Sequence, residues 1–166
     1  MKLRPRAEVI CFKGTKVLAD LRPYVTFPGG GIDPNESPIQ AAKREAMEEA
    51  DRTVITCTVA HPPSVQLWPD SYNMKGSKKY DGGFTYWLTG STGDLPDHGA
   101  GERHKDYQPG FMWYPLSHVI TKLKADIHGD WADDVRVRLA ICEAHLALHQ
   151  PVKTAAPSFA DAIAAG

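Results

Sequence analysis

The sequence predicts an α/β (α+β) fold in which a mixed β-sheet lies between helices. Two observations lead to this prediction. Short runs of β-forming residues occur both before and after one strong helix over residues 38–50, and a second amphipathic helix follows the last of these runs. Because helices and sheets bury their apolar faces against each other in layers, this order of elements predicts one sheet with helices packed on it.

The segment before the first helix predicts a β-hairpin and a glycine turn. Ala7 to Phe12 is a short apolar run typical of a strand, and Lys13-Gly14-Thr15 is a turn. Residues 16–21 then pair back as a second strand. Tyr24 to Phe27 leads from this hairpin into the turn Gly29-Gly30-Gly31.

The helix over 38–50 begins with clear signals and carries three clustered carboxylates. Ser37 is a good N-cap, and Pro38 suits the first helical position because its missing N–H is not needed there. At about 100° of rotation per residue, Glu48 lies roughly 60° to one side of Glu45 and Glu49 roughly 40° to the other. Like charges this close destabilise a helix unless something compensates them. A hard divalent cation such as Mg²⁺ is one compensation, and an exposed salt-bridged surface is the alternative.

Four further strands are expected after this helix. Residues 53–60 alternate β-branched side chains, which is typical of a central strand. Pro62-Pro63 is expected to break this strand, and residues 64–68 form the next. Residues 84–88 and 111–114 are short runs of strong β-formers.

The C-terminal part of the domain predicts two helices. The first is a short helix over 117–124. Asp130 is expected to cap the second, whose Asp133 and Asp134 favour the helix dipole. Apolar residues repeat at helical intervals along this second helix and predict a core-facing stripe: Trp131, Val135, Leu139, Cys142 and Leu146.

Length and composition favour one globular domain in the cytoplasm. The chain has 166 residues, of which 42% are hydrophobic. We expect one domain over 1–150 and a flexible Ala-rich tail over 151–166. This tail is expected to be either loose or an arm over the partner in a homodimer. A net charge of −1 gives no overall attraction to nucleic acid or anionic membranes. Three scattered cysteines fit neither a disulfide framework nor a zinc site. No apolar stretch is long enough for a signal peptide or a membrane span.

The glycine turn and helix together resemble a known motif. Their spacing resembles the signature box of the Nudix hydrolase superfamily, G-x5-E-x7-R-E-U-x-E-E-x-G-U, where U is a bulky aliphatic residue. Six positions of the stretch from Gly30 to Arg52 match it: Gly30, Glu36, Arg44, Glu45, Glu48 and Glu49. This resemblance implies an α/β/α sandwich.

Three residues depart from the box. Ala46 stands where a larger aliphatic is usual, Asp51 replaces the glycine, and Arg52 replaces the final aliphatic residue. That glycine normally ends the helix in a left-handed conformation, which Asp tolerates better than most residues. We expect Val54 to take over the apolar packing that the aliphatic residue of the box usually provides.

The resemblance also implies the site chemistry. It assigns a divalent metal, Mg²⁺ with Mn²⁺ as a substitute, to Glu45, Glu48, Glu49 and the backbone carbonyl near Gly30. Arg44 and Glu36 are expected to form a pair that orients these ligands. The general base is expected to be either a glutamate of the box or an acidic residue of a downstream loop. In that loop Glu102 is the first candidate, followed by His104 and Asp106.

Substrate contacts are expected outside the box. Trp68 and Tyr72 are candidates to stack on a base, and Lys78 belongs to a basic loop that either contacts phosphates or is simply solvated. The expected substrate is a nucleoside diphosphate linked to another group X. A nucleoside triphosphate or modified dNTP ranks first, followed by ADP-ribose or a nucleotide sugar. The alternative is a Nudix domain that binds a nucleotide as a sensor or scaffold without turnover.

Overall fold

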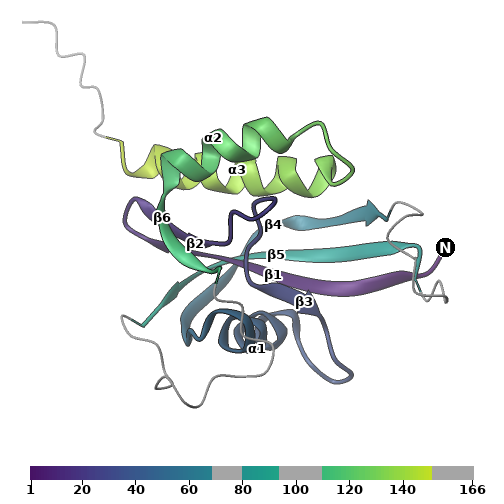
Figure 1. Ribbon diagram of the computed structural model, residues 1–166. Helices are drawn as coiled ribbons and strands as arrows, with labels where there is room; N and C mark the ends of the chain where they lie inside the picture. The colour runs from purple at the N-terminus through teal and green to yellow at the C-terminus, as the bar shows by residue number, and fades with distance from the viewer. Residues whose placement is uncertain (69–79, 94–109, 151–166) are drawn as a thin grey trace, which may run out of the picture.

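The computed structural model describes residues 1–68, 80–93 and 110–150, and there the chain forms a sheet between two helical layers (Figure 1). The strands of the described chain are β1 (Leu3–Lys13), β2 (Lys16–Ala19), β3 (Gly29–Gly31), β4 (Val54–Leu67), β5 (Gly82–Thr92) and β6 (Met112–Pro115). Its helices are α1 (Pro38–Ala50), α2 (Leu116–Asp126) and α3 (Ala132–Leu148). The α/β/α sandwich predicted from the sequence is confirmed.

The sheet is mixed and is organised around β1. Its order is β4-β5-β1-β2-β6, and β3 pairs separately with β1. β1 runs parallel to β5 and antiparallel to β2 and β3. Helix α1 lies on one face, while α2 and α3 lie together on the other (Figure 1). The predicted β1–β2 hairpin is present.

The core between the sheet and α1 explains one departure from the box. Helix α1 buries four alanines, Ala41, Ala42, Ala46 and Ala50. Ala46 is 0% exposed and packs in one cluster with Val9 of β1 and Leu88 of β5. The small side chains allow the helix to lie close to the sheet, so a larger residue at position 46 would overpack this layer.

The second core lies between the sheet and the pair α2 and α3. The predicted stripe of α3 is confirmed: Val135, Leu139 and Cys142 are buried, and Trp131 and Leu146 pack against them. Trp87 of β5 is fully buried in the same cluster. Within the described residues, no helix combines the length and apolar character needed to cross a membrane.

Helix α1 begins and ends as the sequence predicts. Ser37 accepts a hydrogen bond from the Gln40 N–H while the Gln40 side chain accepts one from the Ser37 N–H, which completes a capping box. Asp51 ends the helix in the left-handed region, with φ 54° and ψ 49°. Val54 is buried in the same cluster as Ala50, so the predicted apolar packing by Val54 is confirmed.

Replacing Asp51 tests this helix end. Asp51→Ala will lower the free energy of unfolding by about 1 kcal/mol, since alanine adopts a positive φ less readily than Asp or Gly. Asp51→Gly will be less destabilising than Asp51→Ala, because glycine has no Cβ to strain. Urea denaturation of both variants measures the difference. Equal stability of the two variants would contradict a conformational role for this position.

Two predictions about element boundaries are wrong. Residues 53–60 do not form a central strand that Pro62-Pro63 breaks; β4 is one continuous strand at the edge of the sheet. It passes the prolines through irregular pairing, with register shifts near His61, and an edge strand tolerates missing N–H donors. Asp130 does not cap α3: Trp131 is the N-cap, without a side-chain hydrogen bond.

Candidate active site

The residues of the box meet where β3 joins α1. β3 is the glycine turn itself, and it pairs with residues 6–8 of β1. At position 30 a Cβ would overlap the carboxylate of Glu45, so that side chain would have to move. Glycine is required at position 29, where a Cβ would lie 2.7 Å from the carbonyl oxygen of Ala7. The turn therefore lies against both the central strand and the acidic face of α1.

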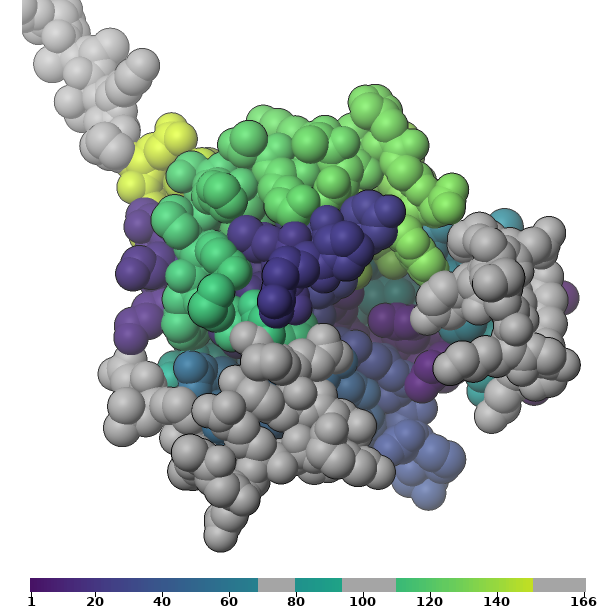
Figure 2. All heavy atoms as spheres, in the orientation of Figure 1, coloured from purple at the N-terminus to yellow at the C-terminus, as the bar shows by residue number. Residues whose placement is uncertain are grey.

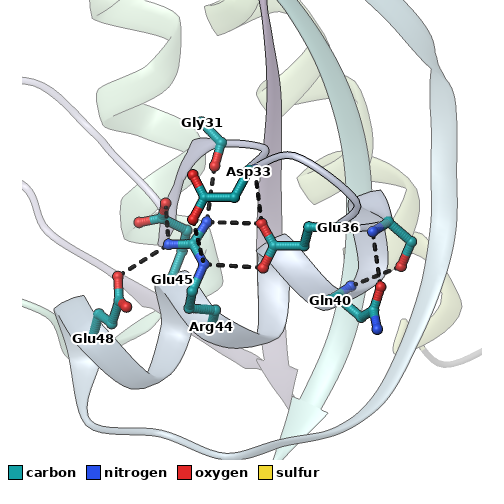
Figure 3. A network of polar contacts seen from close by, with 8 residues as sticks. Gly31, Asp33, Glu36, Gln40, Arg44, Glu45 and Glu48 are labelled. Atoms are coloured by element: carbon teal, nitrogen blue, oxygen red, sulfur yellow. Dashed lines mark hydrogen bonds and ion pairs between the residues drawn. The ribbon is translucent and has the colours of Figure 1, made fainter.

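Arg44 connects the acidic residues of the box (Figure 3). Its Nε and Nη2 each donate to one oxygen of Glu36 at 3.0 Å. Its Nη1 donates to Glu45 at 2.9 Å and to Glu48 at 3.0 Å, and Nη2 also donates to the carbonyl of Gly31 at 2.8 Å. The predicted Arg44–Glu36 pair is present, and one guanidinium fixes three carboxylates and the glycine turn.

Glu36 is held in place from two sides. Besides the two bonds from Arg44, it accepts a hydrogen bond from the Asp33 N–H at 3.0 Å. The hydrogen bonds from Arg44 lower the pKa of Glu36 below its ordinary value. Glu36 is therefore a charged anchor for Arg44, which in turn restricts the rotamers of Glu45 and Glu48.

Glu49 is bound to the opposite end of the turn. Its Oε2 accepts a hydrogen bond from the Gly29 N–H at 3.1 Å. Burial, reinforced by the charge of Glu45, raises the pKa of Glu49 to about 7. Burial likewise raises the pKa of Glu45, despite the hydrogen bond from Arg44. The surroundings of the two carboxyl groups therefore favour their neutral forms more than water does, chiefly because of burial.

The donor set fits a hard divalent cation. Carboxylate oxygens are the ligands that Mg²⁺ and Mn²⁺ prefer, and the charge of a cation would favour ionised Glu45 and Glu49. Arg44 engages one oxygen each of Glu45 and Glu48. As these side chains stand, no three His, Cys, Asp or Glu groups of the described chain converge in a preformed metal site. Binding a metal would therefore require the glutamates to adjust their rotamers around the Arg44 contacts.

A cavity of about 220 Å³ lies on the face of the sheet that α2 and α3 cover, which is the face opposite to α1. Its lining comes from β1, β4 and β5, from the segment before the box, and from α2, α3 and their connection: Arg6, Tyr24, Thr26, Gln66, Trp68, Gly83, Thr85, Asp126, Gly129, Asp130, Trp131, Asp134, Val135 and Arg138. In Figure 2 the indigo segment before the box lies against green α2, where Lys122 Nζ donates to the carbonyl of Pro23 at 3.3 Å.

Arg6 connects the cavity with the acidic site. It lines the cavity, and its backbone pairs with Gly31 at the turn. Its positive charge acts on both Glu45 and Glu49, lowering the pKa of each against the dominant effect of burial. Arg6 is therefore shared by the wall of the cavity and the electrostatic surroundings of the α1 carboxylates.

Beneath the cavity lies a buried ion pair. Arg138 of α3 donates from Nε and Nη2 to the two oxygens of Glu8, both at 2.7 Å, and from Nη1 to the carbonyl of Val25 at 3.3 Å. Glu8 is 3% exposed. This bidentate pair ties α3 to β1, and Arg138 forms part of the cavity wall.

The predicted substrate residues separate into two groups. Trp68 lines the cavity, whereas Tyr72, Lys78 and Glu102, with His104 and Asp106, lie outside the described residues. Sequence reasoning missed the polar wall of the cavity. The sequence places Gln66 in a predicted strand and Asp134 in the first turn of a helix, where it favours the dipole; no local pattern signals that the two line one cavity.

Comparisons with known proteins agree with this geometry. A family model described as the NUDIX domain matches residues 3–135. An 8-oxo-dGTP diphosphatase from Proteus vulgaris is 40% identical over 65 residues, which are 35% of this chain and 58% of the relative. The chain thus matches little more than half the length of that protein.

Solved structures show the same fold. A NUDIX hydrolase from Nitrosomonas europaea has a TM-score of 0.58 at 15% identity, covering 91% of this chain and 94% of the other. An Ap4A hydrolase from C. elegans has a TM-score of 0.51 at 18% identity, covering 89% and 99%. Together with the family model over most of the chain, the box at the β3–α1 junction shows that this protein belongs to the Nudix hydrolase superfamily.

Proposed function

We propose that this protein is a Mg²⁺-dependent pyrophosphohydrolase that cleaves the diphosphate of a nucleoside diphosphate linked to another group. One observation supports this most: the carboxylates of α1 are held at the glycine turn, and Arg6 connects them with an aromatic-lined cavity. An acidic site and a cavity that share Arg6 suit a substrate with a charged diphosphate and a flat base.

Glu45, Glu48 and Glu49 would hold the metal, with the backbone carbonyl near Gly30 as a further ligand. When bound, the metal neutralises the negative charge of the diphosphate and lowers the pKa of the attacking water. Arg44 orients two of the three glutamates, and Glu36 keeps Arg44 in place. Either Glu49, whose burial raises its pKa to about 7, or Glu102 of the downstream loop would accept the proton of the water.

The substrate we rank first is a nucleoside triphosphate or a modified dNTP. The relative from Proteus vulgaris is named 8-oxo-dGTP diphosphatase, while one structural neighbour is titled an ADP compounds hydrolase. Trp68 would contact the base together with Tyr72, and Lys78 would contact a phosphate; the last two lie outside the described residues. We also propose that the protein acts in the cytoplasm and that Mn²⁺ can replace Mg²⁺. The homodimer stays a prediction.

The test is product release from a nucleotide panel, with Mg²⁺ and with EDTA. The panel holds the dNTPs, 8-oxo-dGTP, ADP-ribose, UDP-sugars and dinucleoside polyphosphates. We expect hydrolysis of at least one member with Mg²⁺, loss of that activity in EDTA, and recovery when Mg²⁺ is added in excess. Tight binding of a member without turnover would instead favour the nucleotide sensor.

A further inference from the structure

We propose that the cavity selects a guanine-type base, through hydrogen bonds from the N1–H and N2–H₂ groups of the base to Gln66, Asp126 and Asp134. This inference rests on the proposed function, because it assigns the base of the substrate for that same site. Each of the three residues lines the cavity. Each also has a buried oxygen without a hydrogen-bond partner among the described residues: Oε1 of Gln66, Oδ2 of Asp126 and Oδ1 of Asp134.

The orientation of the Gln66 amide follows from its other contacts. Its Nε2 donates to the carbonyl of Leu67 at 2.7 Å and to that of Asp130 at 3.2 Å. A flipped amide would place its oxygen against these two carbonyl oxygens, which repel it. The NH₂ group of Gln66 therefore donates to backbone carbonyls, and the atom without a partner among the described residues is the acceptor Oε1. Gln66 is 6% exposed, so little water reaches this side chain.

Asp134 and Asp126 add acceptors from the two helices above the sheet. Asp134 lies in the first turn of α3 and is 9% exposed, and Asp126 is the last residue of α2. Burial raises the pKa of Asp134 to about 6, although the charge of Arg138 opposes this. The Arg138 guanidinium donates to Glu8 and to the carbonyl of Val25. A buried acceptor without a donor destabilises the protein, and a ligand that supplies donors removes that cost.

The aromatic side chains of the lining suit a flat ring. Trp68, Trp131 and Tyr24 are part of its lining, and aromatic side chains stack on bases without discriminating among them. Gly83 also lines the cavity, and a Cβ there would lie 3.0 Å from the side chain of Arg6 and 3.6 Å from that of Trp68. Discrimination among bases must therefore come from the polar groups of the wall.

Guanine is the base that matches a wall of acceptors. Its N1–H and N2–H₂ groups are adjacent donors, whereas adenine and cytosine each place one amino group beside a ring nitrogen that is itself an acceptor. Thymine has a single N–H between two carbonyls. An acceptor atom of the base is repelled when it faces a carboxylate. Adenine and the pyrimidines would therefore form fewer hydrogen bonds to the wall than guanine and would also place acceptors against its oxygens. 8-Oxoguanine keeps both guanine donors and adds N7–H.

Calorimetric binding of nucleoside monophosphates to the unmodified protein tests the proposal without requiring turnover. We expect dGMP to bind about 10- to 100-fold more tightly than dAMP, dCMP or dTMP, because the absence of each bond to a charged group weakens binding by about this factor. 8-Oxo-dGMP should bind at least as tightly as dGMP, and dIMP, which lacks the N2 amino group, about 10-fold more weakly. Equal affinity for dGMP and dAMP would overturn the proposal.

Two variants of neighbouring residues test whether Asp134 contributes to the preference for dGMP over dAMP. Asp134→Asn exchanges one carboxylate oxygen for an amide nitrogen of the same size, and we expect it to reduce the dGMP-to-dAMP preference about 10-fold or more. Asp133→Asn, one residue earlier, is the control: the Asp133 side chain is 65% exposed and pairs with Arg136, so the preference should not change. Loss of preference in both variants, or in neither, would contradict the assignment of Asp134.

The two proposals fail in different ways. If no nucleotide is hydrolysed with Mg²⁺ but dGMP still binds selectively, the proposed hydrolase activity is wrong and the base assignment holds. If Mg²⁺-dependent hydrolysis proceeds with equal kcat/KM for dGTP, dATP and dCTP, the base assignment is wrong and the hydrolase holds.

Discussion

Glu49→Gln will lower kcat for nucleotide hydrolysis by about 10²- to 10⁴-fold, since both roles open to this residue, metal ligand and general base, need an ionised carboxylate. Glu48→Gln should lose activity on a similar scale through weaker metal binding. The fold should survive, because the amide oxygen of a glutamine at position 49 can still accept the hydrogen bond from Gly29. Steady-state kinetics with saturating Mg²⁺ measures the loss.

The free energy of unfolding of the Glu49→Gln variant should also depend on pH differently from that of the unmodified protein. Burial raises the pKa of Glu49 from 4.5 to about 7, so its ionisation destabilises the folded state increasingly as the pH rises between these two values. A neutral glutamine removes that penalty, so the gain in stability of the variant over the unmodified protein should be small at pH 5 and larger at pH 8. Glu143→Gln is the control, because Glu143 is half exposed on α3 and pairs with Lys124. Full activity of Glu49→Gln would show that the acidic site is wrongly assigned.

Arg138→Met will lower the free energy of unfolding by about 3–5 kcal/mol, because it leaves Glu8 charged and buried without its partner. The two residues share two hydrogen bonds at 2.7 Å, with side chains that are 11% and 4% exposed. The double variant Glu8→Gln/Arg138→Met should recover part of this loss, since no isolated charge then remains in the core. Urea denaturation at neutral pH measures all three proteins.

Arg136→Met is the matched control for this ion pair. Arg136 lies two residues earlier on α3, but it is 58% exposed and forms a surface pair with Asp133. Its replacement should change the free energy of unfolding by no more than about 0.5 kcal/mol. If Arg138→Met is as stable as Arg136→Met, the buried pair does not hold α3 on β1.

The acidic site was predictable because its determinants are local. The glycine, cap and carboxylate positions of the box lie within one stretch of sequence, and helical periodicity alone places Glu45, Glu48 and Glu49 on one side of α1. The same holds for the helix end: Asp51 is one of the few residue types that accept the left-handed conformation, and it adopts φ 54°. The Arg44–Glu36 pair was implied by the family resemblance, and the hydrogen bonds confirm that the two side chains meet.

The cavity and the position of β4 were not predictable, because they depend on distant contacts. Gln66 bonds to the backbone of Asp130, 64 residues away, and Arg138 bonds to Glu8, 130 residues away. Alternating β-branched residues in 54–59 give the same pattern at the edge of a sheet as at its centre, yet Ile55 and Val59 are 63% and 68% exposed. Only the pairing order of the strands distinguishes the two positions.

If the glutamates of α1 hold a divalent metal for hydrolysis, Mn²⁺ should bind to them. A Mn²⁺ titration followed by electron paramagnetic resonance measures this binding on the unmodified protein and on Glu49→Gln, with Glu143→Gln as control. We expect the unmodified protein and Glu143→Gln to bind Mn²⁺ with the same affinity, and Glu49→Gln to bind it about 10- to 100-fold more weakly. Equal Mn²⁺ affinity in all three proteins would contradict this metal site and would place the metal elsewhere.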